Sequence, residues 1–158
     1  MADRHPSRAM IWLTILAAPV ALAFETSLRS FLFPPEFEWF RQELEPFLTP
    51  LAWLLGLAAA LASLLGAGLQ RRIARRKLDR LPENAPPDTR LREVQAVFLL
   101  TASVPQVPAI LSTFAYMFGA SLVPVLVGIA ICTLGVGLQA VRIGSLASVS
   151  RPAGSELP

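Results

Sequence analysis

Residues 47–69 read FLTPLAWLLGLAAALASLLGAGL, and no charged side chain interrupts them. About 20 consecutive apolar residues suffice for a helix to cross the ~30 Å hydrocarbon core of a bilayer. A backbone in lipid must satisfy its own hydrogen bonds, and an α-helix does so within one segment. We therefore predict that residues 47–69 form a transmembrane helix.

Two further segments, residues 94–118 and 122–143, have the same character. The chain carries no Asp, Glu, Lys or Arg between Glu93 and Arg142. Each segment is long enough to cross a bilayer. Only residues 119–121 separate them, so we expect an antiparallel helical hairpin.

The first apolar segment, residues 9–33, is less regular as a span. Its apolar run is unbroken from Met10 to Phe24, and Glu25 then interrupts it. Glu25 and Arg29 are spaced i,i+4 with the acid first, which is the favourable order on a helix. We interpret them as a candidate interfacial ion pair near the outer end of a helix that continues to residue 33.

A signal peptide is the alternative for this segment. Arg4 and Arg8 precede the apolar run, and residues 21–23 form an A-x-A cleavage motif. Cleavage would leave three spans. We favour the uncleaved helix, because the apolar run and its continuation suit an anchor. The predicted fold class is then an all-α integral membrane protein, with four transmembrane helices in a bundle and one membrane domain over residues 1–158.

A short amphipathic helix is expected on the outer face between the first two spans. The residues of its apolar stripe follow one another at helical spacing: Phe33, Phe37, Phe40, Leu44 and Phe47. Pro46 marks an expected corner before the second span. We interpret this helix as lying on the membrane surface with Trp39 at headgroup level. The alternative is a lid, or a docking surface for an extracytoplasmic partner.

The distribution of Arg and Lys predicts the orientation. Residues 70–93 hold eight basic and four acidic residues, whereas residues 25–46 hold two basic and five acidic ones. We predict a cytoplasmic basic loop over residues 70–93, with both termini cytoplasmic. Lys77 is the only lysine among 14 basic residues, a bias of GC-rich bacterial genes. We therefore expect a multi-pass protein of a bacterial inner membrane. The tail, residues 148–158, should be flexible.

The basic loop begins as a continuation of the second helix. Its first part carries four clustered arginines: Arg71, Arg72, Arg75 and Arg76. A basic residue near an anionic membrane surface contributes about 1 kcal/mol of binding. We interpret the four as candidate lipid-headgroup contacts. A specific ligand site is the alternative.

The third span carries a candidate intramembrane polar site, formed by Ser103, Gln106 and Thr113 on one helical face. Gln106 is expected to be the deepest strongly polar side chain of the chain. Pro105 and Pro108 lack the N–H of the helical pattern, so a kink is expected. Gln106 can hydrogen-bond across the bundle, a contribution of about 0.6–2 kcal/mol. The alternative is a substrate or ion site at a broken helix.

Small residues mark the expected packing faces, because they let helices approach closely in lipid. The stripe in the second span comprises Gly56, Ala60, Ser63 and Ala67, and that in the fourth comprises Gly128, Cys132 and Gly135.

Other chemistry is disfavoured by the residue inventory. Cys132 is the only cysteine and His5 the only histidine, so we expect no metal site, no cofactor and no catalytic residues. Apart from Glu25, every acid falls outside the expected membrane core, which argues against a proton-carrying rotor subunit. The positive charge is confined to one loop, which argues against nucleic-acid binding.

Two function classes remain. The first is a non-catalytic membrane subunit or scaffold, whose partners are the lipid bilayer and a membrane protein or a second copy of the chain. The alternative is a small oligomeric permease or channel that uses the polar face around Gln106. We expect no enzymatic activity.

Overall fold

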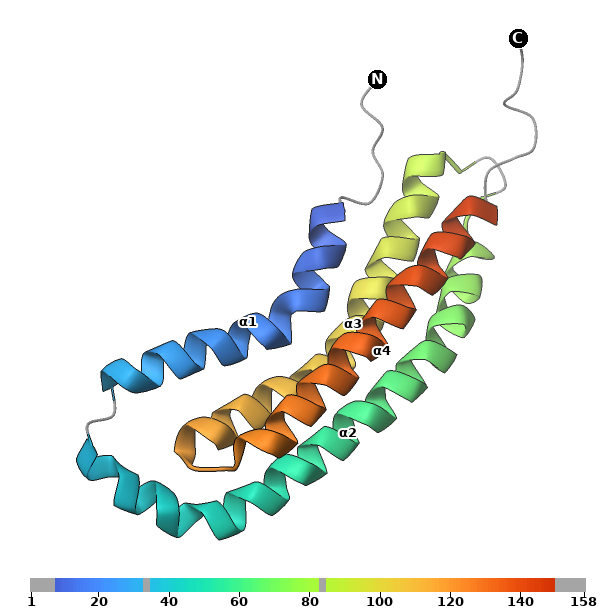
Figure 1. Cartoon of the computed structure of the whole chain (residues 1–158). Helices are drawn as coiled ribbons and strands as arrows, with labels where there is room; N and C mark the ends of the chain where they lie inside the picture. The colour runs from blue at the N-terminus through green and yellow to red at the C-terminus, as the bar shows by residue number, and fades with distance from the viewer. Residues whose placement is uncertain (1–7, 33–34, 83–84, 150–158) are drawn as a thin grey trace.

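The computed structural model describes residues 8–32, 35–82 and 85–149, which are helical apart from short connections. The elements are α1 (Arg8–Leu32), the 3-10 turn η1 (Pro35–Phe37), α2 (Glu38–Leu78), α3 (Pro87–Phe118) and α4 (Leu122–Val149). Within these ranges four helices pack together, and all four are long and apolar enough to cross a membrane (Figure 1). The predicted fold class is therefore confirmed.

The candidate spans are Met10–Arg29, Pro35–Leu78, Arg92–Phe118 and Leu122–Arg142. Each overlaps one of the four spans expected from the sequence. The expected tail from residue 148 starts within α4, which continues to Val149. Residues 150–158 lie outside the described part of the chain.

The short helix expected between the first two spans joins the second span without a break. Phe33 lies outside the described residues. Residues 35–47 form η1 and the first turns of α2, and α2 continues through Pro46 and Pro50. The corner expected at Pro46 is therefore absent. Thr49 lies beside the α3–α4 turn, where its hydroxyl accepts a 2.9 Å hydrogen bond from the N–H of Ser121. Contacts of this kind hold the turns that contain Pro46 and Pro50 in helical form. This first part of α2 curves beneath the α3–α4 turn (Figure 1).

Helices α2, α3 and α4 form the close-packed part of the molecule, and α1 is peripheral. Among the described residues, α1 packs on α3 and α4 but not along α2. It bends in its middle, the part that contains Pro19, and its second half leads away from α4 (Figure 1). Proline removes a backbone hydrogen bond, which accounts for such a bend. α1 continues through the A-x-A motif at residues 21–23 to Leu32.

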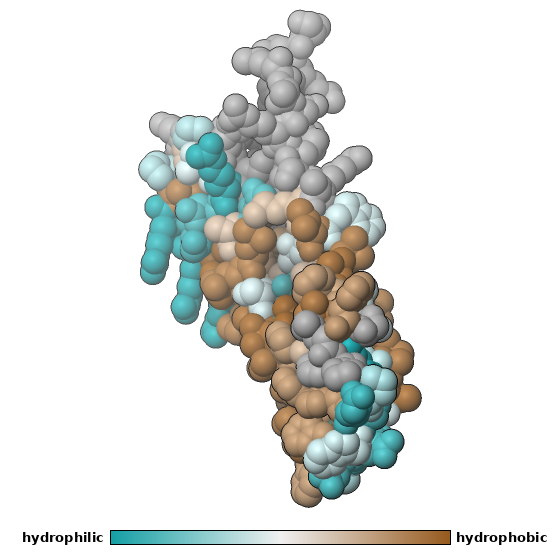
Figure 2. Space-filling view, turned by 90° about the vertical axis from the view of Figure 1, so that its left-hand side faces the viewer, coloured by the Kyte–Doolittle hydropathy of each residue, from teal (hydrophilic) through white to brown (hydrophobic). Residues whose placement is uncertain are grey.

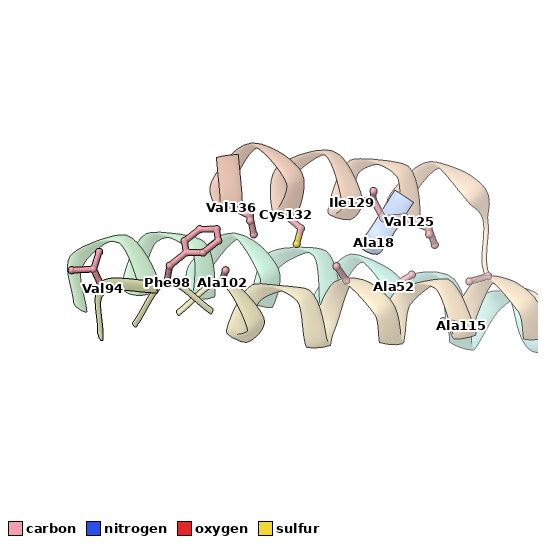
Figure 3. Close-up of a cluster of buried hydrophobic side chains, with 12 residues drawn as sticks. Ala18, Ala52, Val94, Phe98, Ala102, Ala115, Val125, Ile129, Cys132 and Val136 are labelled. Atoms are coloured by element: carbon pink, nitrogen blue, oxygen red, sulfur yellow. The ribbon is translucent and has the colours of Figure 1, made fainter. Parts of the chain in front are cut away.

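Small side chains bring the core helices together. The buried face of α2 carries Ala52, Gly56, Ala59, Ser63, Gly66, Gln70 and Ala74, along with Arg41 near its start. A Cβ placed on Gly128 of α4 would lie 3.2 Å from the Cα of Gly56, so the two backbones are nearly in contact. On α4, Val125, Ile129, Cys132 and Val136 follow one another along the face turned to the other helices (Figure 3). Cys132 is therefore a small buried packing residue, whereas Ala60 and Ala67 lie at the edge of the face.

The α3–α4 hairpin closes through a short turn at Gly119. Gly119 has φ of +131°, a conformation that side chains rarely adopt. The N–H of Ala120 donates to the carbonyl of Ala115 at 2.9 Å, which satisfies the end of α3. The antiparallel hairpin predicted from the short connection is observed.

Polar side chains gather at the two ends of the molecule. Figure 2 shows a hydrophobic band between two hydrophilic zones. At one end α2 finishes and α3 begins, with the arginine cluster near the end of α2; we call it the basic end. At the opposite end lie the start of α2 and the α3–α4 turn (Figure 1).

Candidate functional site

Two of the three residues of the candidate polar site face α1. The side-chain amide of Gln106 donates a hydrogen bond to the backbone carbonyl of Thr14. Thr113 is buried and hydrogen-bonds the carboxyl group of Glu25. Ser103 lies on the exposed surface, where its hydroxyl donates to the carbonyl of Leu100 at 2.9 Å. The polar face of α3 is therefore mainly a seam against α1.

The seam extends toward the basic end of α3. There Gln95 donates to the sulfur atom of Met10 at 2.9 Å. Three polar contacts thus hold α1 to α3. Buried Ala18 belongs to the hydrophobic core, and Ile11, Ile15 and Leu22 of α1 pack against that core. α3 is helical through Pro105 and Pro108, so Gln106 is presented by a continuous helix.

Glu25 is the one acid that the structure buries in a candidate span, with 6% of its surface exposed. Its Oε2 atom has no hydrogen-bond partner among the described residues. The Thr113 hydroxyl has one proton, which it donates to the carbonyl of Ile110 at 2.7 Å. The same hydroxyl is the hydrogen-bond partner of the Glu25 carboxyl group.

The expected ion pair between Glu25 and Arg29 is wrong. Arg29 instead pairs with Glu38 of α2 at 3.0 Å, and its guanidinium lies 5.4 Å from the centre of the Tyr116 ring. The i,i+4 rule considers one helix alone. In the folded chain Glu25 turns inward toward α3, and α2 offers Arg29 a different carboxylate.

Arg41 is a structural residue that the sequence analysis did not single out. It is buried at the start of α2, and its guanidinium donates to the carbonyls of Met117 and Tyr116 at 3.3 and 3.2 Å. It also pairs with both oxygens of Glu38 at 3.0 Å. A cation suits the carbonyls at a helix C-terminus, so Arg41 caps α3. Its one sequence signal is its position as one of only two basic residues in the acidic segment, residues 25–46.

Two glutamines are more fully buried within the chain than Gln106, which is half-buried. Gln70 and Gln139 are both 0% exposed. The amide of Gln70 donates to the carbonyl of Gln139 at 3.3 Å, and the amide of Gln139 donates to the carbonyl of Ser63 at 3.4 Å. Gln70 was assigned to the cytoplasmic loop, but it lies on the buried face of α2.

A sequence signal for these glutamines exists. Gln139 follows Gly135 by four residues, and Gln70 follows Gly66 by four, so each extends a stripe of small residues. A Cβ on Gly66 would lie 2.8 Å from the Nε2 atom of Gln139. Glycine at residue 66 therefore makes room for the glutamine amide between α2 and α4.

The four arginines of the basic end are exposed on α2. None of them forms an ion pair among the described residues. Lys77 pairs instead with Glu93 of α3 at 2.8 Å. With three apolar side chains and one glycine they line a groove of about 660 Å³ on the outside of α2.

No group of three or more metal-ligating side chains gathers among residues 8–32, 35–82 and 85–149. The chain matches no family model, no curated protein and no solved structure. The geometry of its own residues is therefore the basis of any functional proposal.

Proposed function

We propose that the chain is a non-catalytic membrane subunit or scaffold, which packs against another membrane protein or a second copy of itself through α1. The supporting observation is the uneven burial of its spans. In the α1 span 11% of the residues are buried, against 39% in each of the spans of α3 and α4. Most of the apolar surface of α1 is therefore left to be covered by molecules other than this chain.

The exposed side of α1 is better suited to contact another helix than to contact lipid alone. Ala23 and Ser27 are spaced i,i+4 on this side, and both are exposed. The hydroxyl of Ser27 donates to the carbonyl of Ala23 at 2.9 Å, so it does not need a bond from a partner. Small residues at this spacing allow close helix approach in a membrane. Phe24, also exposed, would add apolar contact area beside them.

The close-packed core argues for a scaffold rather than a conduit. At Gly56 and Gly128 the backbones of α2 and α4 nearly touch, and such contact leaves no lumen between them. The buried glutamines bond to carbonyls of the neighbouring helices. We propose that the protein resides in a bacterial inner membrane with the basic end in the cytoplasm, as the charge distribution favours.

Photo-crosslinking tests the proposal directly. A photoreactive phenylalanine analogue would replace Phe24 of α1 and, as a matched control, Leu134 of α4; these residues are 64% and 69% exposed. We expect a protein adduct of defined mass from residue 24 and lipid adducts alone from residue 134. An adduct of twice the chain's mass would identify a second copy as the partner. Lipid adducts alone from both residues would contradict the proposal.

The second candidate is a small permease or channel. The observation that favours it is the polar seam of Gln106 and Thr113 against α1, where one oxygen of Glu25 has no partner among the described residues. Movement of the peripheral helix would open this seam. Flux of ions or small solutes into vesicles that contain only the pure protein, lost in Gln106→Leu, would support this candidate over the scaffold.

A further inference from the structure

The outward face of α2 changes character within a few turns near the basic end. Leu64, Gly68, Arg71 and Arg75 follow one another at spacings of four, three and four, and so do Leu65, Leu69, Arg72 and Arg76. Residues at these spacings lie in line along a helix surface. Each line is thus apolar toward the middle of the span and cationic toward its end. Together the eight residues line the groove of about 660 Å³.

Gly68 opens this groove. A Cβ added at residue 68 would meet no atom within 4 Å, so packing inside the chain does not require glycine there. Glycine within a helix costs about 1 kcal/mol relative to alanine. The missing side chain leaves space between Leu64 and Arg71 on the surface, where an external chain could lie.

The charges of the groove are uncompensated within the described part of the chain. Its four arginines are exposed, and none of them forms an ion pair with another described residue. Four like charges on two helical turns repel one another, and an anion between them relieves that repulsion. The guanidinium group binds phosphate through paired hydrogen bonds. The groove therefore favours a phosphate above an apolar chain.

We propose that this groove is a binding site for one anionic phospholipid. Its phosphate lies among Arg71, Arg72, Arg75 and Arg76, and an acyl chain follows Gly68 between Leu64 and Leu65. At ~1.5 Å per residue the groove is about 18 Å long, close to half of the ~30 Å hydrocarbon core plus a headgroup. The site goes beyond diffuse attraction of basic residues to a charged surface, and it is independent of the proposed partner of α1.

Native mass spectrometry of the full chain in detergent can test the site. The probes are a phosphatidylglycerol and a phosphatidylcholine with the same acyl chains, together with the deacylated headgroup glycerophosphoglycerol. We expect one phosphatidylglycerol to bind at least ten-fold more tightly than phosphatidylcholine. Equal affinities for the two lipids would overturn the role of the arginines. Equally tight binding of the deacylated headgroup would make the ligand a free anion and overturn the lipid.

Gly68→Leu separates a groove from diffuse charge attraction, because it fills the groove and keeps all four arginines. We expect it to weaken phosphatidylglycerol binding at least ten-fold. Gly137→Leu on α4 is the matched control, since residue 137 also has no atom within 4 Å of an added Cβ. It should bind the lipid as the unchanged chain does. Unchanged binding by Gly68→Leu, or an equal loss in the control, would overturn the site.

Paired arginine variants provide a second test that leaves the helix packing intact. Arg72→Gln with Arg76→Gln should weaken binding about thirty-fold, the equivalent of about 1 kcal/mol for each arginine. Arg80→Gln with Arg92→Gln removes the same charge from outside the groove and should change binding less than three-fold. Circular dichroism would establish that each variant is folded. Equal losses in the two pairs would show that net charge alone determines binding.

Discussion

Arg41 joins the first turns of α2 to the end of α3 through bonds to the carbonyls of Tyr116 and Met117. Glu38 bridges it to Arg29 of α1, at 3.0 Å from each guanidinium. Arg41 and Glu38 together thus link α1, α2 and α3 at the end opposite the basic end. The two arginines differ in burial, because Arg41 is 7% exposed and Arg29 25% exposed at the side chain.

Replacing Arg41 should therefore destabilise the protein more than replacing Arg29. Arg41→Met removes the guanidinium that donates to the carbonyls of Tyr116 and Met117, and hydrogen bonds to charged groups contribute about 1.5–3 kcal/mol. We expect a loss of about 1.5–3 kcal/mol in the free energy of unfolding. Arg29→Met, the control, should lose less than about 1 kcal/mol, as is usual for exposed ion pairs. Denaturant titration in mixed micelles would measure both, and equal losses would contradict the capping role.

Gln106 gives a second prediction at this scale. Gln106→Leu removes one bond to the carbonyl of Thr14, and membrane hydrogen bonds contribute only about 0.6–2 kcal/mol. We expect the variant to fold and to lose less than about 2 kcal/mol of stability, with its biological role intact. Gln106→Glu should be less stable, because a carboxylate there must be protonated or solvated. Thermal unfolding would measure the stability of both variants, and complementation in cells would measure their biological activity. A Gln106→Leu variant that is stable but does not complement would instead favour the transport function.

The sequence identified the polar residues better than it identified the partners of those residues. It placed Gln106 and Thr113 on one face of α3, but the docking of α1 against that face depends on long-range packing. It paired Arg29 with Glu25, because the competing carboxylate of Glu38 belongs to another helix. It ended the second span before Gln70, because hydropathy falls there although the helix and its buried face continue.

At the scale of the helices, α2 shows how tertiary contacts override a local signal. Pro46 would end an isolated helix, since proline removes a hydrogen bond and clashes with the preceding turn. Arg41 and Thr49 flank this proline, and each bonds to the end of α3 or to the α3–α4 turn. The continuous helix is therefore a property of the folded chain that residues 33–47 alone do not indicate.

The contact between Gly56 and Gly128 gives the prediction at this scale. A leucine at residue 128 would press against the backbone of α2, because an added Cβ already lies 3.2 Å from the Cα of Gly56. Overpacking of this kind costs about 1–3 kcal/mol, and we expect Gly128→Leu to lose that much stability. Gly137→Leu has open space at its Cβ and should not be destabilised. Similar unfolding midpoints for the two variants would contradict a close-packed α2–α4 interface.

At the scale of the whole molecule, the sequence predicted the four helices and the α3–α4 hairpin from hydropathy and loop length alone. The close packing of α2 and α4 follows from their stripes of small residues. The peripheral place of α1 was not predictable, because its apolar run resembles the other spans. The structure places the start of α1, the α2–α3 connection and the end of α4 at one end (Figure 1), as an even number of spans requires.

Cysteine accessibility tests the four-span topology most directly. In a Cys132→Ala background, single cysteines would replace Glu43 and Arg80, which are exposed near opposite ends of the molecule. The label is a membrane-impermeant maleimide, applied to intact spheroplasts and then after permeabilisation. We expect Glu43→Cys to react in intact spheroplasts and Arg80→Cys to react only after permeabilisation, because the charge distribution favours a cytoplasmic basic end. Labelling of both residues from the same side would contradict a helix α2 that spans the membrane.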